Sequence, residues 1–157
     1  MIVVADTSPL NYLLLIGQID LLPQLFREVL IPEAVRDECL DPDAPKPLRE
    51  WILNPPAWLV IQSISGIDLT LSALDSGEQA AILLAQTLPA DLFIIDERLG
   101  RNAARDRGIP IVGTIGILDD SASQGLIDLP NAIAQLQKTN FRISQRIVES
   151  LFRDKGN

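Results

Sequence analysis

Two aspartates directly follow short apolar runs of the kind that form buried strands. Ile2–Ala5 is followed by Asp6, and Leu92–Ile95 is followed by Asp96. Uninterrupted apolar runs of this length are typical of strands that a parallel sheet buries on both faces. Functional groups in such sheets gather outside the carboxyl ends of the strands. We therefore expect Asp6 and Asp96 at the same edge of the sheet, although either could serve only as a turn or capping residue.

Two glutamates could join these aspartates. Glu38 lies on the helix expected after the second strand, and Glu78 begins the helix expected over Gln79–Leu88. Carboxylates at close range suppress each other's ionisation unless a cation compensates their charge. A group of oxygen ligands without histidine or cysteine is suited to Mg²⁺ or Mn²⁺. Such a cluster is typical of phosphoryl chemistry, in which a bound cation activates water.

Both glutamates also have a structural interpretation. The spacing of Asp75 and Glu78 fits a capping box, in which Glu78 accepts a hydrogen bond from the Asp75 backbone amide. Glu38 shares its helix with Glu33, Arg36 and Asp37, so that helix could simply expose a charged face. The pattern leaves both interpretations open for each glutamate.

Composition narrows the chemistry. The 157 residues include no histidine and one cysteine, Cys39, which we expect to be a small buried apolar residue. Histidine general bases, Ser-His-Asp and Cys-His catalysis, imidazole zinc sites and disulfide frameworks are thereby excluded. With 13 Lys and Arg against 21 Asp and Glu, the net charge is −8, which argues against broad electrostatic capture of nucleic acid. An acidic enzyme can still act on nucleic acid if divalent cations screen its carboxylates.

The arginines are distributed unevenly. Arg98, Arg101 and Arg105 share one face of the helix expected directly after Asp96. We expect Arg98 and Arg101 to contact a substrate phosphate. The alternative is a solvated helix face, or salt bridges to the excess acids.

Strand and helix patterns alternate along the chain. The expected strands are 2–5, 29–31, 58–61, 92–95 and 109–112. The expected helices run approximately over 8–16, 19–26, 32–40, 48–53, 79–88, 98–107, 114–124, 131–138 and 144–153. This alternation predicts one three-layer α/β/α domain over residues 1–157, with a central, mainly parallel sheet. The helices over about 131–153 form an appended tail.

The tail carries an apolar stripe at helical spacing. Its members are Ile143, Ile147, Val148, Leu151 and Phe152. The stripe predicts self-association into a homodimer or higher homo-oligomer, or packing back on the domain. The chain shows no signal-peptide pattern and no apolar run of membrane-spanning length, so we expect a cytoplasmic protein without membrane contact.

Five segments of the chain form a recognisable series: residues 2–10, 29–38, 75–82, 93–98 and 111–118. In this order they resemble PIN-domain nucleases. They resemble more closely a branch related to the VapC-like ribonuclease toxins of bacterial toxin–antitoxin pairs. The resemblance covers essentially residues 1–120, and the final helices are similar to that branch's tail.

The resemblance implies a PIN-like fold and an endoribonuclease that depends on Mg²⁺ or Mn²⁺. Asp6 matches the aspartate after the first strand, Glu38 the helix glutamate after the second strand, and Asp96 the aspartate after the later strand. Glu78 stands where the toxins commonly have aspartate. Asp6 and Asp96 would then be the main metal ligands, Glu78 a ligand directly or through water, and Glu38 a ligand or the residue that orients the attacking water. Residues expected to support these four acids are Thr7, Ser8 and Thr114.

The resemblance also implies partners: an RNA substrate and, for a toxin, a small antitoxin protein. Two other phosphate chemistries fit poorly. A receiver-type phosphoacceptor needs a lysine at the end of a late strand, and none of the three lysines is so placed. A phosphatase of the haloacid dehalogenase type needs Asp-x-Asp, but Thr7 and Ser8 follow Asp6. The remaining alternative is a PIN-like module that binds RNA or protein without catalysis. Metal-dependent cleavage of RNA distinguishes the two.

Overall fold

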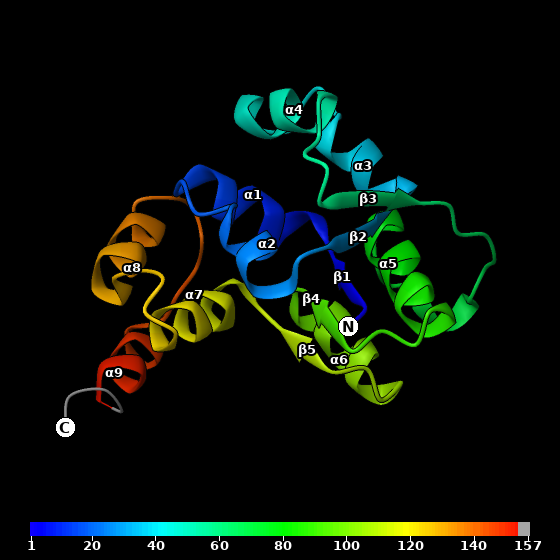
Figure 1. Cartoon of the computed structure of the whole chain (residues 1–157). Helices are drawn as coiled ribbons and strands as arrows, with labels where there is room; N and C mark the ends of the chain where they lie inside the picture. Colours follow the sequence, from blue (N-terminus) through cyan, green and yellow to red (C-terminus); the bar gives the residue numbers. More distant parts are fainter. Residues whose placement is uncertain (154–157) are drawn as a thin grey trace.

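A five-stranded parallel sheet forms the centre of the computed structural model, which describes residues 1–153 (Figure 1). The strand order is β3-β2-β1-β4-β5. The strands are β1 (Val3–Ala5), β2 (Val29–Pro32), β3 (Leu59–Gln62), β4 (Leu92–Ile94) and β5 (Ile111–Val112). Each differs from its expected range by at most two residues. The largest difference is at the start of β5, where Pro110 has no amide hydrogen to donate to a neighbouring strand.

The two strands that precede the aspartates are neighbours in the middle of the sheet. β1 pairs with β4 in parallel, with Val4 opposite Phe93 and Ala5 opposite Ile94. The backbone amide of Asp6 continues this pairing, because it donates to the carbonyl oxygen of Ile94 at 2.9 Å. Both aspartates therefore leave the sheet at the same edge, which confirms the expectation from the sequence.

Helices connect the strands and cover the sheet. They are α1 (Thr7–Leu15), α2 (Leu21–Phe26), α3 (Glu33–Cys39), α4 (Lys46–Leu53), α5 (Ser76–Thr87), α6 (Arg98–Asp106), α7 (Thr114–Ser123), α8 (Leu129–Gln137) and α9 (Gln145–Arg153). A short 3₁₀ helix, η1 (Leu69–Leu71), was not expected from the sequence. Asp68 caps it locally, because its carboxylate accepts from the amide of Thr70 at 2.9 Å. Arg107 adds a distant contact, since it donates to the side chains of Asp68 and Thr70.

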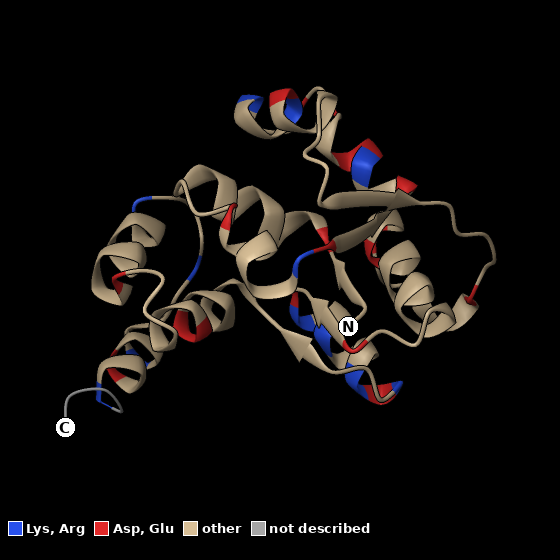
Figure 2. Ribbon diagram, viewed as in Figure 1, with Lys and Arg blue, Asp and Glu red and all other residues tan. Residues whose placement is uncertain are grey.

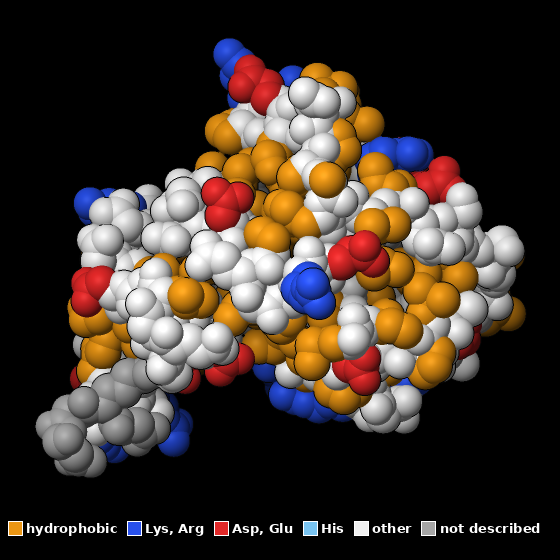
Figure 3. Space-filling view, in the orientation of Figure 1, with side chains coloured by type: hydrophobic (Ala, Val, Ile, Leu, Met, Phe, Trp, Pro, Cys, Tyr) orange, Lys and Arg blue, Asp and Glu red, His pale blue; other side chains and the backbone are white. Residues whose placement is uncertain are grey.

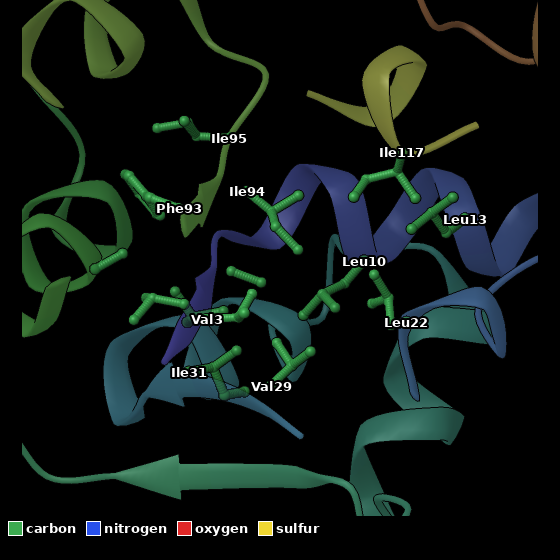
Figure 4. Packing of buried hydrophobic residues seen from close by; sticks show 14 of the residues in the cluster. Val3, Leu10, Leu13, Leu22, Val29, Ile31, Phe93, Ile94, Ile95 and Ile117 are labelled. Carbon is green, nitrogen blue, oxygen red and sulfur yellow. The ribbon is translucent and has the colours of Figure 1, made fainter. Parts of the chain in front are cut away.

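The helices form a layer on each side of the sheet. α1 and α2 pack with α7 on one side, and α5 packs with α6 on the other (Figure 1). Figure 4 shows that side chains of β4 and of Ile95, which follows it, pack against both helix layers. Ile94 points toward α1 and Ile117, whereas Phe93 and Ile95 point to the opposite side. All three side chains are fully buried. Burial on both faces explains the unbroken apolar run, and the three-layer α/β/α fold with a parallel central sheet is confirmed.

Most of the apolar stripe of the tail packs back on the rest of the chain. Val148 is buried, and Ile143, Leu151 and Phe152 are half-buried against the core. Ile147 is 45% exposed. Packing against the rest of the chain accounts for most of the stripe. Self-association into a homodimer or higher homo-oligomer stays a prediction.

The face shown in Figure 3 carries hydrophobic side chains between isolated charges. Leu53, at the end of α4, is 71% exposed. Within residues 1–153, no helix has both the length and the apolar character that crossing a membrane requires.

Candidate functional site

A cavity of about 540 Å³ lies at the carboxyl edge of the sheet and is strongly acidic. Its acidic lining residues are Asp6, Glu38, Asp41, Asp43, Asp75, Glu78 and Glu97. Three of the four acids singled out in the sequence therefore line one cavity. The fourth, Asp96, lines two adjoining cavities of about 430 and 320 Å³. We refer to the first as the acidic cavity.

Asp6 is the most deeply placed of these acids. It follows β1 directly and is only 3% exposed. Burial raises its pKa to about 7; the amide of Thr7 lowers the pKa, and the charges of Asp75, Glu38 and Asp96 raise it further. Its Oδ1 is buried without a hydrogen-bond partner among the described residues. Such an oxygen is costly to bury unless a cation or a donor reaches it.

Glu78 lies in the first turn of α5 and is 7% exposed. Burial raises its pKa to about 8, and the neighbouring carboxyl of Asp75 and the charge of Asp6 act in the same direction. The space that Glu78 occupies depends on Gly100, because a Cβ there would lie 2.7 Å from Oε2 of Glu78. That Oε2 is buried and has no hydrogen-bond partner within residues 1–153.

Of the two hydrogen bonds in the capping box expected at α5, the one to the Asp75 side chain is present. Oδ1 of Asp75 accepts a hydrogen bond from the backbone amide of Glu78 at 2.8 Å. In the other direction, the backbone amide of Asp75 favours the ionised form of Glu78 and so lowers its pKa. Capping leaves Oε2 of Glu78 unpartnered, so a capping role and a metal-binding role are compatible.

Glu38, on α3, is half-buried and held by two hydrogen bonds. Oγ1 of Thr7 donates to its Oε2 at 2.6 Å, and the amide of Gly77 donates to its Oε1 at 3.1 Å. Burial raises its pKa; these donors lower the pKa, and Asp75 raises it. Two fixed donors leave each carboxylate oxygen with capacity to accept one more proton or hydrogen bond.

Asp96 is half-buried, and hydrogen bonds from Thr114 and Ser8 hold its carboxylate. Thr114 donates twice, from its amide to Oδ1 and from Oγ1 to Oδ2, both at 2.7 Å. Oγ of Ser8 donates to Oδ2 at 3.4 Å. Burial raises the pKa of Asp96, while these donors and the charge of Arg101 lower it. Thr7, Ser8 and Thr114 thus each contact one of the four acids; their part in metal binding or catalysis stays a prediction.

Two further glycines leave the space that the carboxylates of Glu38 and Asp96 occupy. A Cβ at Gly77 would lie 2.6 Å from Oε2 of Glu38 and closer still to Oε1. A Cβ at Gly113 would lie 2.9 Å from Oδ1 of Asp96. Side chains at these positions would displace the two acids that hydrogen bonds hold in place.

Among the lining residues of the acidic cavity that sequence reasoning did not assign to the site, two stand out by their contacts and burial. Asp75 was assigned only a capping role, yet its carboxyl contacts those of both Glu38 and Glu78. Its position at the start of α5 is the signal, because the first turn brings the side chains of Asp75 and Glu78 together. Asn11 lines the cavity with a buried Oδ1 that has no partner within the described part of the chain. Its spacing of four from Thr7 on α1 places both on one helix face.

A divalent cation fits the group of carboxylates around Asp6 and Glu78. Among residues 1–153, no three His, Cys, Asp or Glu side chains are already gathered into a metal-binding group. The fit lies in the unpartnered oxygens of Asp6 and Glu78. Neighbouring carboxyls that raise each other's pKa are stabilised by a cation between them. Mg²⁺ typically uses one or two carboxylates and retains several waters, so two free carboxylate oxygens are enough to begin a site.

The arginines of α6 differ in their surroundings. The blue bands on α6 in Figure 2 mark its basic residues. Nη1 of Arg101 donates to the carbonyl oxygen of Ile95 at 3.4 Å, and Arg101 lines the cavity of about 430 Å³ beside Asp96. Arg98 is exposed, and Arg105 donates to Asn102 at 3.5 Å. Phosphate contacts by Arg98 and Arg101 stay a prediction.

Comparisons with known proteins show the fold and the family of the chain. Residues 2–157 match the family model described as DUF3368, a PIN domain. The fold is similar to that of a PilT N-terminus domain protein from the hyperthermophilic archaeon Sulfolobus solfataricus P2, with a TM-score of 0.54 and 14% sequence identity over 92% of this chain and 100% of that chain. At that identity the match shows the fold alone. No curated protein matches the chain. Since the family model spans nearly all of the sequence, the chain belongs to the PIN-domain family, whose members are generally nucleases.

Proposed function

We propose that this protein is a divalent-cation-dependent endoribonuclease that hydrolyses phosphodiester bonds in RNA. The observation that best supports the proposal is the pair of buried, unpartnered oxygens, Asp6 Oδ1 and Glu78 Oε2, beside the acidic cavity of a PIN domain. The resemblance of five segments to VapC-like ribonuclease toxins favours RNA as the substrate.

Each acid has a role in the proposal. Asp6, Glu78 and Asp96 would hold Mg²⁺ or Mn²⁺, which when bound acidifies a water molecule and neutralises charge on the phosphate. Glu38 orients the attacking water and accepts its proton. Burial raises the pKa of Glu38, and an elevated carboxyl pKa brings a general base closer to the operating pH. Thr114 and Ser8 hold the carboxylate of Asp96 in one orientation.

A cleavage assay tests the proposal. The protein is incubated with a panel of single-stranded and structured RNAs in Mg²⁺ or Mn²⁺, and in excess chelator. We expect RNA cleavage only with the cation. Cleavage that persists in chelator would reject the mechanism. Binding without cleavage across the whole panel would support the alternative, a PIN-like module that binds RNA or protein without catalysis.

The proposal extends to the cell. The resemblance to VapC-like toxins supports a cytoplasmic toxin that a small antitoxin protein restrains. The excess of 21 acidic over 13 basic residues is consistent with an enzyme that relies on bound cations to approach RNA.

Gly77 gives a steric test of Glu38. Gly77→Ala would place a Cβ against the carboxylate of Glu38, so we expect RNA cleavage to fall by about tenfold or more, since misplacement by about 1 Å can cost about a hundredfold. The melting temperature should hold, because alanine is favoured over glycine in a helix by about 1 kcal/mol. Initial rates and thermal melts of the same preparation measure both effects.

The control for this prediction shortens the acid. Glu38→Asp in the Gly77→Ala background removes one methylene and should relieve the collision, so the double variant should cleave better than additivity of the two single variants allows. Strict additivity, or full activity of Gly77→Ala, would show that the contact between Gly77 and Glu38 does not matter for cleavage.

A further inference from the structure

A second cavity, of about 430 Å³, is lined by Asp96 and, among residues 1–153, shares no lining residue with the acidic cavity. It forms where β5 and the start of α7 meet the segment that follows α8. Among its lining residues are Asp96, Arg101, Gly113, Gly116, Phe141 and Arg142. Arg142 comes from the tail, 41 positions after Arg101, and the sequence did not indicate that the two arginines would face one cavity.

A third cavity, of about 320 Å³, lies between these two. It shares Ser8, Tyr12 and Glu97 with the acidic cavity. It shares Asp96, Phe141 and Arg142 with the cavity of about 430 Å³. The three cavities are therefore neighbours in a row, with the acidic cavity at one end and the two arginines at the other.

Contacts from α1 fix the tail segment beside this row. The hydroxyl of Tyr12 donates to Oδ1 of Asn140 at 2.7 Å. The rings of Tyr12 and Phe141 meet edge to face, with centroids 4.9 Å apart and planes at 83°. The amide of Phe141 donates to Oγ1 of Thr139 at 3.1 Å. Arg142 directly follows these anchored residues, and Figure 2 shows the basic residues in the link between α8 and α9.

Neither of the two arginines forms an ion pair within residues 1–153, although the charge of Arg101 lowers the pKa of Asp96. Arg36 and Arg107 form ion pairs with acidic side chains, but within residues 1–153 neither Arg101 nor Arg142 has an acidic partner within 4.0 Å. The described hydrogen bond of Arg101 is the long one to a carbonyl oxygen. A planar guanidinium with free donors is suited to a phosphate, which it can bind through two parallel hydrogen bonds. In a chain of net charge −8, two unpaired arginines around one cavity favour an anion there.

We propose that Arg142, together with Arg101, binds a backbone phosphate of the RNA strand next to the one that is cleaved. This proposal rests on the proposed endoribonuclease function, because the acidic end of the row repels phosphate unless a cation is bound. A strand along the row has its scissile phosphate beside Asp6 and Glu78 and a neighbouring phosphate at the basic end. The contact is to the phosphate and is independent of base and sugar. Arg142 is thus a substrate-positioning residue supplied by the tail.

Direct binding tests the subsite without cleavage. A fluorescent single-stranded RNA octamer is titrated in Mg²⁺ in the Glu38→Gln background, which removes the proposed general base and keeps Asp6, Glu78 and Asp96. Anisotropy is followed over a series of salt concentrations. Adding Arg142→Ala should weaken binding by about tenfold and reduce the slope of log K against log salt by about 0.7, the value for one phosphate contact in a single strand. Arg142→Lys should keep the slope and lose only part of the affinity, since it keeps the charge but not the fork.

A matched control lies four residues further along the tail. Arg146 is exposed on α9 and is not among the lining residues of the three cavities, so Arg146→Ala should change affinity by less than about twofold. A single-stranded DNA octamer of the same sequence should lose the same factor with Arg142→Ala. A loss confined to RNA would overturn the assignment to phosphate.

The outcomes separate the subsite from the proposed function. If the octamer binds through Arg142 but the wild-type protein cleaves no RNA in Mg²⁺ or Mn²⁺, the nuclease proposal fails and the subsite stands. If the wild type cleaves RNA and Arg142→Ala leaves both affinity and KM unchanged, the subsite is wrong and the nuclease proposal stands. If no RNA binds to the wild-type protein, both are wrong.

Discussion

Replacing Asp6 with asparagine should lower kcat for RNA cleavage by at least about a hundredfold, which corresponds to about 2.7 kcal/mol of lost transition-state stabilisation. The cause is the loss of a buried carboxylate whose Oδ1 has no partner in the described structure and is free to bind a cation. Asparagine has nearly the same shape, so the cavity should remain. Initial rates with saturating Mn²⁺ measure the effect. Asp106→Asn, at the exposed end of α6, should cleave RNA at the wild-type rate.

The same substitution should change how stability depends on pH. Burial raises the pKa of Asp6 from 3.8 to about 7 in the folded protein, so the folded state keeps a proton that the unfolded state releases above about pH 4. The free energy of unfolding therefore decreases as pH rises between about 4 and 7. Glu78, with a pKa raised to about 8, extends the decrease to higher pH.

Thermal melts in chelator from pH 5 to pH 8.5 measure this dependence. The wild-type melting temperature should fall as pH rises, and Asp6→Asn should fall less and be the more stable protein at pH 8.5. Adding Mn²⁺ should raise the wild-type melting temperature most at high pH, where the carboxylates are ionised. Identical pH profiles for the two proteins would show that Asp6 titrates normally.

Substitutions at Glu78 should separate its two roles. Glu78→Gln keeps a side chain that can accept a hydrogen bond from the Asp75 amide. It also removes a carboxyl whose ionisation is opposed by burial and by its acidic neighbours. The metal-free protein should therefore melt at the wild-type temperature or slightly above it. Cation affinity and RNA cleavage should fall by at least about tenfold, or about 1.4 kcal/mol. Glu78→Ala should lose the activity and in addition roughly 1 kcal/mol of stability, because it also removes the capping contact.

Glu97 provides the control for Glu78, because it lines the same cavity but is exposed. Glu97→Gln should affect cleavage much less than Glu78→Gln does. Normal cleavage by Glu78→Gln would mean that Glu78 is structural. The cation site would then consist of Asp6 and Asp96, with Glu38 or Asp75 as the further acid.

The fold could be predicted from the sequence because its strong signals are local. The apolar runs before Asp6 and Asp96 identify strands buried on both faces, and the alternation with helices implies a parallel sheet that brings both aspartates to one edge. The exception is η1, which combines a local cap by Asp68 with contacts from Arg107, 39 positions from Asp68 and 37 from Thr70. A local pattern carries no trace of such a contact.

The candidate site could be predicted only in part for the same reason. Acids at strand ends follow from topology. The sequence predicted one cluster of four acids, whereas the structure places three of them around the acidic cavity and Asp96 beside the neighbouring ones. The close approach of Gly77 to Glu38 depends on how α5 packs against α3, 39 residues apart. The role of Arg142 depends on where the tail crosses the sheet edge. Both arise from packing between distant segments and not from periodicity or spacing.

Crystals grown with Mn²⁺ test the central claim most directly, through an anomalous difference map that locates the cation. We expect one strong peak in contact with Oδ1 of Asp6 and Oε2 of Glu78, and its loss in crystals of Asp6→Asn. A protein that cleaves RNA while Mn²⁺ binds elsewhere, with Asp6 and Glu78 both out of contact with it, would contradict the assignment of this cluster as the metal site.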